Sequence, residues 1–174
     1  MEHKQTSLAE QDRLYLAHCV LLAEQALDAG DEPFGSILVD RDGQVIAEER
    51  NLVGGGDATQ HPEFALARWA AHHVAPAERA DCTVYTSGEH CPMCSAAHAW
   101  VGLGRIVYAS STQQLAAWMT EWQLPGPPLI ALSIQEVAPS IPVAGPDPVL
   151  SEQVRELHRR YRQSQGQIAS SNHG

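Results

Sequence analysis

The feature that most constrains the fold of this chain is the alternation of two kinds of apolar pattern along it. Helix-type patterns are expected at residues 8–29, 62–74, 92–103 and 115–122, and from 148 onward. Strand-type runs are expected at residues 34–39, 45–50, 82–86, 105–109 and 134–137. Interleaved helices and strands predict a three-layer α/β/α fold, in which helices flank a central mixed sheet of about five strands.

Local signals mark where several of these segments begin. Residues 7–10 read Ser-Leu-Ala-Glu, which has the form of a capping box and predicts a helix start there. Asp42 and Gly43 separate the first two strand-type runs and predict an antiparallel hairpin. The chain has 174 residues and is expected to form one domain, with flexible tails at 1–6 and 164–174.

The charge of the chain bears on its partners and location. The formal net charge is −10, and such a surface repels a phosphate backbone, so a nucleic-acid partner is not expected. No stretch approaches the roughly 20 apolar residues of a membrane helix, and no signal-peptide run follows the first residues. We therefore expect a cytoplasmic protein that does not enter a membrane.

Two of the four cysteines, Cys91 and Cys94, form a Cys-x-x-Cys motif. Without a secretion signal, this spacing indicates metal or redox chemistry rather than a disulfide. By itself the motif is equally compatible with a redox site or with half of a structural zinc ribbon. The other two, Cys19 and Cys82, fall within apolar patterns and are expected to be small buried hydrophobes.

An upstream His-x-Glu motif, formed by His61 and Glu63, shifts the interpretation towards catalysis. Both motifs stand where a loop is expected to enter a helix, and helix N-termini favour the thiolate form of a cysteine. A catalytic zinc typically takes three protein ligands and keeps its fourth position for water. His61, Cys91 and Cys94 would form such a shell and leave that position open.

The two motifs together match H-x-E followed by P-C-x-x-C, the signature of zinc nucleobase deaminases, except that His90 replaces the proline. Further matches are residues 32–36 (Glu-Pro-Phe-Gly-Ser), Asn51 and residues 87–94 (Ser-Gly-Glu-His-Cys-Pro-Met-Cys). On these residues the chain resembles the cytidine deaminase-like superfamily over roughly residues 8–122. Within the superfamily it is most similar to the bacterial guanine deaminase and tRNA adenosine deaminase branch.

This resemblance implies a zinc-dependent hydrolytic deaminase with a cytidine deaminase-like fold. Zinc would lower the pKa of a bound water from about 15.7 towards 7, and the hydroxide would attack an amidine-like carbon with release of ammonia. Glu63 would be the catalytic acid–base group and not a ligand. The resemblance also implies a homodimer that contributes residues across its interface.

The implied substrate is a free nucleobase or a related amino-heterocycle, with a guanine-like purine favoured. Adenosine in tRNA and a cytosine-type pyrimidine are the enzymatic alternatives, and a zinc-stabilised binding module is the non-enzymatic one. A basic stripe near the site would favour tRNA. A Glu63 side chain turned away from the metal would favour the binding module.

Three residues are assigned to the substrate pocket by the resemblance: Asn51 as a hydrogen-bonding anchor, with Phe34 and Trp100 as aromatic walls. Plain structural alternatives exist, because Asn favours turns and an aromatic residue on an apolar face is commonly core. Pro62 departs from the Ala or Gly that the family commonly has, and it offers no N–H to a substrate oxygen. The acidic pair that guanine deaminases carry after the fourth strand has no clear match, since Trp118, Glu121 and Trp122 stand there.

Overall fold

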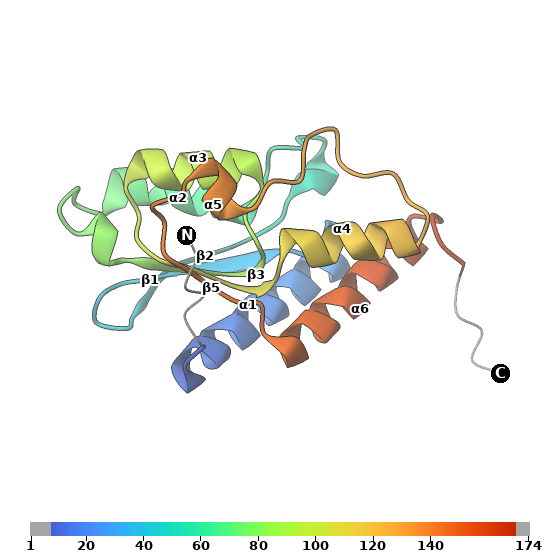
Figure 1. Cartoon of the computed structure of the whole chain (residues 1–174), viewed down its shortest axis with the longest axis horizontal. Helices are drawn as coiled ribbons and strands as arrows, with labels where there is room; N and C mark the ends of the chain where they lie inside the picture. The colour runs from blue at the N-terminus through green and yellow to red at the C-terminus, as the bar shows by residue number, and fades with distance from the viewer. Residues whose placement is uncertain (1–7, 170–174) are drawn as a thin grey trace.

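A computed structural model describes residues 8–169 as a five-stranded sheet with helices on both faces (Figure 1). The strands are β1 (Gly35–Val39), β2 (Val45–Arg50), β3 (Thr83–Gly88), β4 (Ile106–Ser110) and β5 (Val143–Ala144). Their order is β2-β1-β3-β4-β5; β1 runs antiparallel to β2 and β3, whereas β3, β4 and β5 run parallel. The mixed sheet and the predicted α/β/α fold are confirmed.

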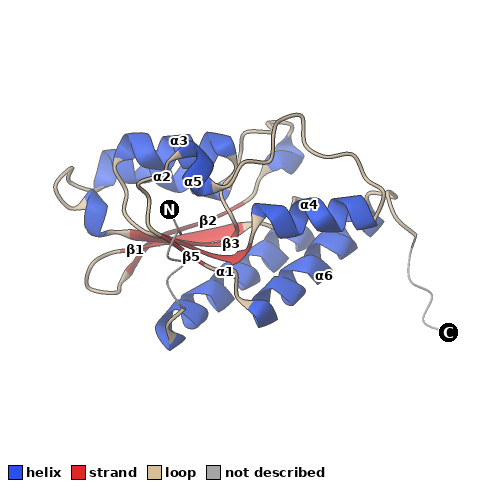
Figure 2. Ribbon diagram, viewed as in Figure 1, coloured by secondary structure: helices blue, strands red, loops and turns tan. Residues whose placement is uncertain are grey.

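The helices form the two outer layers. They are α1 (Glu10–Asp28), α2 (Pro62–His73), α3 (Pro92–Val101), α4 (Thr112–Glu121), α5 (Ile134–Val137) and α6 (Pro148–Ser164), with 3-10 turns η1 (Val53–Gly55) and η2 (Arg79–Asp81). Helices α1, α4 and α6 cover one face, and α2, α3 and α5 cover the other (Figure 2). Within residues 8–169, no helix has both the length and the apolar character that crossing a membrane requires.

Strand β1 supplies side chains to both layers. Ile37 and Val39 belong to the apolar cluster under α1 and α6, whereas Leu38 belongs to the cluster under α2. Successive side chains of a strand point to opposite faces, so Ser36 shares the α2 face with Leu38. All five residues of β1 are buried, which places the Ser36 hydroxyl inside the protein.

Residues 134–137, expected to be a strand, form the short helix α5 instead. The Ser133 hydroxyl accepts the Glu136 N–H at 3.4 Å, and the Glu136 carboxylate accepts the Ser133 N–H at 2.7 Å. This reciprocal capping box starts a helix, and a short apolar run alone does not distinguish the two structures. The fifth strand is β5, which follows α5 along the chain.

Several predicted ends also shift. Helix α1 begins at Glu10 rather than at residue 8, and Asp12 accepts the Ala9 N–H at 2.9 Å at its start. The predicted cap, Ser7, lies outside the described residues, as do the predicted tail at 1–6 and residues 170–174. Residues 165–169, part of the other predicted tail, fold back onto α6, where the Gln163 side chain donates to the Ala169 oxygen at 3.0 Å.

His158 gives the fold a defined sensitivity to acid. His158 lies on α6, and its side chain is buried. Its ring packs edge-on against the ring of Phe34, with the ring centroids 4.9 Å apart. Burial, with a smaller contribution from Arg162, lowers the pKa of His158 from 6.5 to about 3. The unfolded chain therefore takes up this proton near pH 6.5, whereas the folded protein does not. The contribution of His158 to the free energy of unfolding is therefore fully present above pH 6.5. As the pH falls below 6.5, this contribution decreases by about 1.4 kcal/mol per pH unit.

We expect the free energy of unfolding to fall by about 1.4 kcal/mol more in the wild-type protein than in His158→Leu when the pH drops from about 7.5 to about 5.5. Urea unfolding followed by circular dichroism at the two pH values measures the difference. The other buried histidines are common to both proteins and cancel in the comparison. An equal pH dependence in the two proteins would show that His158 has no such role.

Candidate active site

The two sequence motifs meet at the N-termini of α2 and α3. His61 directly precedes Pro62, the first residue of α2, and Cys91 directly precedes Pro92, the first residue of α3. Proline is favoured at this position, which defines where each helix begins. The two helices pack against each other on one face of the sheet (Figure 1). This packing brings His61 next to Cys91 and Cys94.

The three side chains have the spacing of zinc ligands. Nδ1 of His61 lies 3.6 Å from the Sγ atoms of both Cys91 and Cys94, and the two sulfur atoms are 3.5 Å apart. A tetrahedral zinc ion with bonds of about 2.0–2.3 Å holds nitrogen and sulfur ligands about 3.5–3.8 Å from one another. The donor set therefore fits a zinc ion, and three ligands leave one coordination position for water.

Glu63 points at this cluster from the first turn of α2. Its side chain is buried, and its Oε2 lies 3.6 Å from Sγ of Cys94. Its other oxygen, Oε1, accepts the Thr86 hydroxyl at 2.9 Å and lies 3.3 Å from the Ser36 hydroxyl. Burial raises the pKa of Glu63 above its usual value. A carboxyl group of raised pKa holds a proton more readily, which suits general acid–base catalysis.

The two thiols differ sharply in acidity. A hydrogen bond from Cys94, together with one from His61, lowers the pKa of Cys91 to about 4. The same bond to Cys91, with burial, raises the pKa of Cys94. The contact with Cys91 raises the pKa of His61 to about 9. Zinc binding would remove the protons from both thiols and the extra proton from the imidazole of His61, because metal-coordinated thiols are deprotonated and a coordinating imidazole is neutral.

A family model described as the cytidine and deoxycytidylate deaminase zinc-binding region matches residues 9–110. The matched span runs from the start of α1 to the end of β4 and includes His61, Glu63, Cys91 and Cys94. The chain belongs to this family. It is therefore a zinc-type deaminase by family, and the donor set is the part of the chain that fits the family's metal.

Relatives of this chain differ in the substrates for which they are named. The chain is 39% identical over 110 residues to a probable cytosine deaminase of Schizosaccharomyces pombe, and this alignment covers 63% of this chain and 67% of that protein. It is 37% identical over 98 residues to a guanine deaminase of Bacillus subtilis, and this alignment covers 55% of this chain and 62% of that protein. A solved structure in complex with 2,6-diaminopurine superposes with a TM-score of 0.67 at 25% identity, covering 97% of this chain and 90% of the other.

Asn51, a predicted substrate contact, lies beside the residues of the His-x-Glu motif. Its backbone N–H donates to the Phe34 oxygen, and the N–H of the next residue donates to the oxygen of Gln60, directly before His61. The side chain is fully buried, and its Oδ1 accepts a backbone N–H at 3.0 Å. Its Nδ2 has no hydrogen-bond partner in the part of the chain that the structure describes. Asn51 thus retains a buried donor, as a substrate anchor requires.

Phe34, the second predicted contact, lies against the end of β3. A Cβ atom at Gly88 would lie 2.9 Å from Cε1 of Phe34, so the glycine makes room for the ring. On another side the ring meets His158 of α6. Phe34 therefore stands close to the loop that carries Cys91, where it could form an apolar wall.

Trp100, the third predicted contact, does not lie beside the zinc-ligand cluster of its own chain. Its side chain is 90% exposed. It lies near the end of α3, which starts at Pro92, and a rise of about 1.5 Å per residue places it roughly 12 Å along the helix from the cluster. Trp100 therefore lies apart from the zinc-ligand cluster of its own chain, and its contact with a substrate stays a prediction.

The structure also gives roles to two residues for which the sequence analysis predicted none. Glu89, two residues before Cys91, accepts the first N–H groups of α4 and α5 at 2.8 and 2.9 Å and so anchors the cysteine loop. Asp31 accepts the Gly54 N–H at 2.7 Å and so holds the loop after Asn51. Both are acidic residues near a motif, but the backbone N–H groups whose hydrogen bonds they accept are distant in sequence. Sequence alone therefore does not reveal these contacts.

His90, which stands in place of the family's proline, is fully buried. Its ring meets that of His98 at right angles, with centroids 5.5 Å apart. Burial lowers the pKa of His90, and neither ring nitrogen has a partner within residues 8–169. His90 therefore packs as a neutral core residue beside the cysteine loop.

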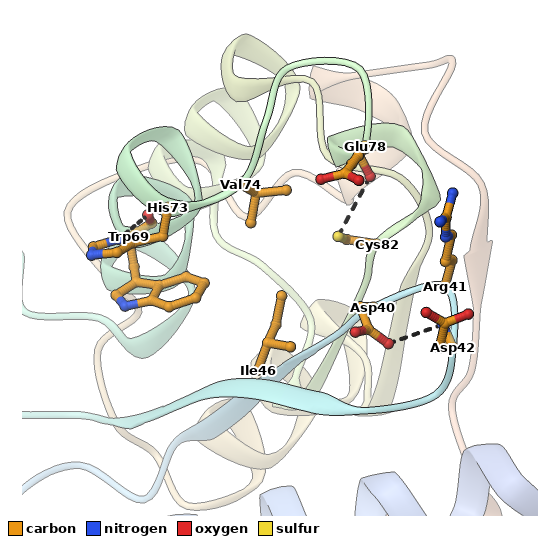
Figure 3. Close-up of a pocket in the computed structure, with 9 residues that line it drawn as sticks. All are labelled: Asp40, Arg41, Asp42, Ile46, Trp69, His73, Val74, Glu78 and Cys82. Carbon is orange, nitrogen blue, oxygen red and sulfur yellow. Dashed lines mark hydrogen bonds between the residues drawn. The ribbon is translucent and has the colours of Figure 1, made fainter.

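A hollow of about 260 Å³ lies away from the candidate site (Figure 3). It is lined by the turn between β1 and β2, the C-terminal half of α2, and the segment that leads into β3. Its residues are Asp40, Arg41, Asp42, Ile46, Trp69, His73, Val74, Glu78 and Cys82. None of the predicted site residues lines the hollow, and the zinc-ligand cluster and Glu63 lie at the other end of α2.

Proposed function

We propose that this protein is a zinc-dependent hydrolytic deaminase of a free nucleobase or related amino-heterocycle, with a guanine-like purine as the first candidate. One observation carries the proposal: His61, Cys91 and Cys94 have the spacing of zinc ligands, and a Glu63 oxygen lies 3.6 Å from one of them. The relative named guanine deaminase and the structure with 2,6-diaminopurine support a purine.

The reaction replaces an amino group on a ring carbon by oxygen from water and releases ammonia. Zinc, when bound, lowers the pKa of a water and so supplies a nucleophile at neutral pH. Glu63 would take one proton from the attacking water as the C–O bond forms, and would deliver that proton to the adjacent ring nitrogen. It would then transfer the second water proton to the amine as the C–N bond breaks.

The residues beside the cluster supply contacts for a flat ring. The Nδ2 of Asn51 would donate to an acceptor on the ring, since this buried donor has no partner in the described chain. Phe34 would pack against the face of the ring. Pro62 has no N–H to offer, so recognition of a ring oxygen falls to other donors. An aromatic base that places one hydrogen-bond acceptor near the Asn51 amide fits these contacts.

The arginines of α6 argue for a small substrate rather than tRNA. Each has a carboxylate partner, in the pairs Arg155–Glu121, Arg159–Glu156, Arg160–Glu24 and Arg162–Glu32. Paired arginines in a chain of net charge −10 form no basic stripe for a phosphate backbone.

Two further features bear on the alternatives. A binding module would leave Glu63 free to turn away, whereas its Oε2 faces Cys94. We also propose the homodimer that the resemblance implies, with Trp100, whose side chain is 90% exposed, as a candidate contact in its interface. Any contact between Trp100 and a substrate would then depend on a second copy of the chain.

An ammonia-release screen tests the proposed function. The substrates are guanine, 2,6-diaminopurine, cytosine, the matching nucleosides and a tRNA anticodon stem-loop, each assayed with the wild-type protein and with Glu63→Gln. We expect release from a free base, guanine first, and loss of that release in the variant. Release from the stem-loop with none from any free base would replace the proposal with RNA editing.

A further inference from the structure

We propose that Ser36 and Thr86 form a hydroxyl pair that fixes the orientation of the Glu63 carboxylate, and that both are positioning residues. Their effect on turnover rests on the proposed function. The orientation of the carboxylate does not, because it follows from contacts in the structure itself.

The sheet places the two hydroxyls opposite each other. Ser36 of β1 is the direct cross-strand partner of Thr86 of β3. Both side chains are completely buried on the sheet face that α2 covers, where Glu63 enters from the first turn of the helix. Farther along the two strands the same face carries Leu38 and Val84, which pack in the apolar cluster under α2. The polar pair thus interrupts an otherwise apolar layer directly beneath Glu63.

The distances determine which hydroxyl donates to which acceptor. The Thr86 hydroxyl lies 2.9 Å from both Oε1 of Glu63 and the Gly88 oxygen, but it has one proton to give. A bond to a carboxylate is stronger than a bond to a neutral carbonyl, so the proton goes to Glu63. The Ser36 hydroxyl lies 2.9 Å from Thr86 and 3.3 Å from Glu63, so it donates to Thr86. The result is a chain of bonds from Ser36 through Thr86 to Oε1.

Packing alone gives no reason for this pair. Buried hydroxyls are costly unless they are hydrogen-bonded, and valine has nearly the shape of threonine. An apolar pair would therefore continue the layer formed by Leu38 and Val84 without that cost. The only polar atoms within hydrogen-bond distance of the two hydroxyls, among the described residues, are each other, Oε1 of Glu63 and one backbone oxygen, and the donated protons lead to Glu63. Their chemistry is directed at the carboxylate.

Holding one oxygen of Glu63 leaves the other for catalysis. With Oε1 bound to Thr86, Oε2 is the oxygen that faces Cys94 and the zinc-ligand cluster. A buried carboxylate without this bond can rotate, and proton transfer requires donor and acceptor within about 2.6–3.2 Å of each other. Loss of the pair should therefore slow the chemical step more than it weakens substrate binding.

Three variants separate positioning from packing. Thr86→Val removes the bond to Glu63 and is expected to lower kcat by about 10- to 100-fold with little change in KM. Ser36→Ala removes only the supporting bond and should cost less, about 3- to 10-fold. Thr86→Ser keeps the hydroxyl and should restore most of kcat. The matched control is Thr83→Val, the same change at the start of β3, which should leave kcat unchanged.

Kinetics, zinc content and high-resolution crystal structures of the zinc-loaded proteins together decide the matter. We expect full zinc in Thr86→Val, with the Glu63 carboxylate in more than one orientation, and a single orientation in Thr86→Ser. Unchanged kcat in a zinc-replete Thr86→Val, or an unchanged Glu63 in its structure, would overturn the inference. If Thr86→Val fails to fold or to hold zinc, Ser36→Ala decides: lowered kcat beside a normal Thr86→Ser supports the pair, and any other result overturns it.

Failure of the proposed deaminase function and failure of the positioning role can be distinguished. If the wild-type protein released ammonia from no substrate, the kinetic comparison would fall away. The orientation of Glu63 in Thr86→Val and, should that variant not fold, in Ser36→Ala would still support or overturn the positioning role.

Discussion

Glu63→Gln is expected to lower the rate of ammonia release by about 10²- to 10⁴-fold, the share of a rate that general acid–base catalysis supplies. Glutamine has nearly the shape of glutamate but cannot carry a proton between water and substrate. Because Glu63 lies outside the group of three zinc ligands, the variant should keep its zinc. Steady-state kinetics and metal analysis of the same preparation measure the two effects.

A matched control for Glu63→Gln is Glu78→Gln, which makes the same change at an exposed position in the hollow at the other end of α2. This control should keep both zinc and turnover. Near-normal turnover in Glu63→Gln would remove Glu63 from the proton-transfer role. Loss of zinc in Glu63→Gln would instead make the carboxylate part of the metal site.

Cys94→Ala is expected to lose zinc and, with it, ammonia release. Cys94 is fully buried, and its sulfur lies 3.5–3.6 Å from the other two donors. Loss of an outer partner of a ligand typically costs about 10- to 100-fold in metal affinity, so loss of a ligand itself should cost more. Metal analysis after dialysis against a weak chelator measures the change.

Cys82→Ala serves as the control for a buried thiol. Cys82 is also buried, but it lies in the hollow at the opposite end of α2 and outside the donor group. This variant is expected to lose some stability and to keep its zinc. Equal zinc content in Cys94→Ala and Cys82→Ala would refute the assignment of Cys94 as a ligand.

The parts of the site that could be predicted from sequence are those set by local structure. Proline at the first position of α2 and of α3 fixes where each helix starts. His61 and Cys91 therefore take the same place relative to their helices, and Cys94 follows one turn later. The spacing of a motif along one helix is local information, and in the structure the ligand atoms of these three residues lie within 4.8 Å of one another.

The parts that sequence reasoning missed depend on contacts between distant segments. Ser36 and Thr86 meet only because of the register between β1 and β3, and neither strand shows that register in its own residues. The short apolar run at 134–137 suits either a strand or a helix, and its capping box decides for a helix. Trp100 was placed by resemblance; it lies apart from the zinc-ligand cluster of its own chain, and its contact with a substrate stays a prediction.

Zinc content and ammonia release, measured together while zinc is removed stepwise with a chelator and then returned, test the central claim most directly. The substrate is the best free base from the screen. If His61, Cys91 and Cys94 hold the zinc that deamination requires, the rate falls in proportion to the zinc removed and recovers when zinc is added back. Full ammonia release from a preparation that has lost its zinc would contradict the claim.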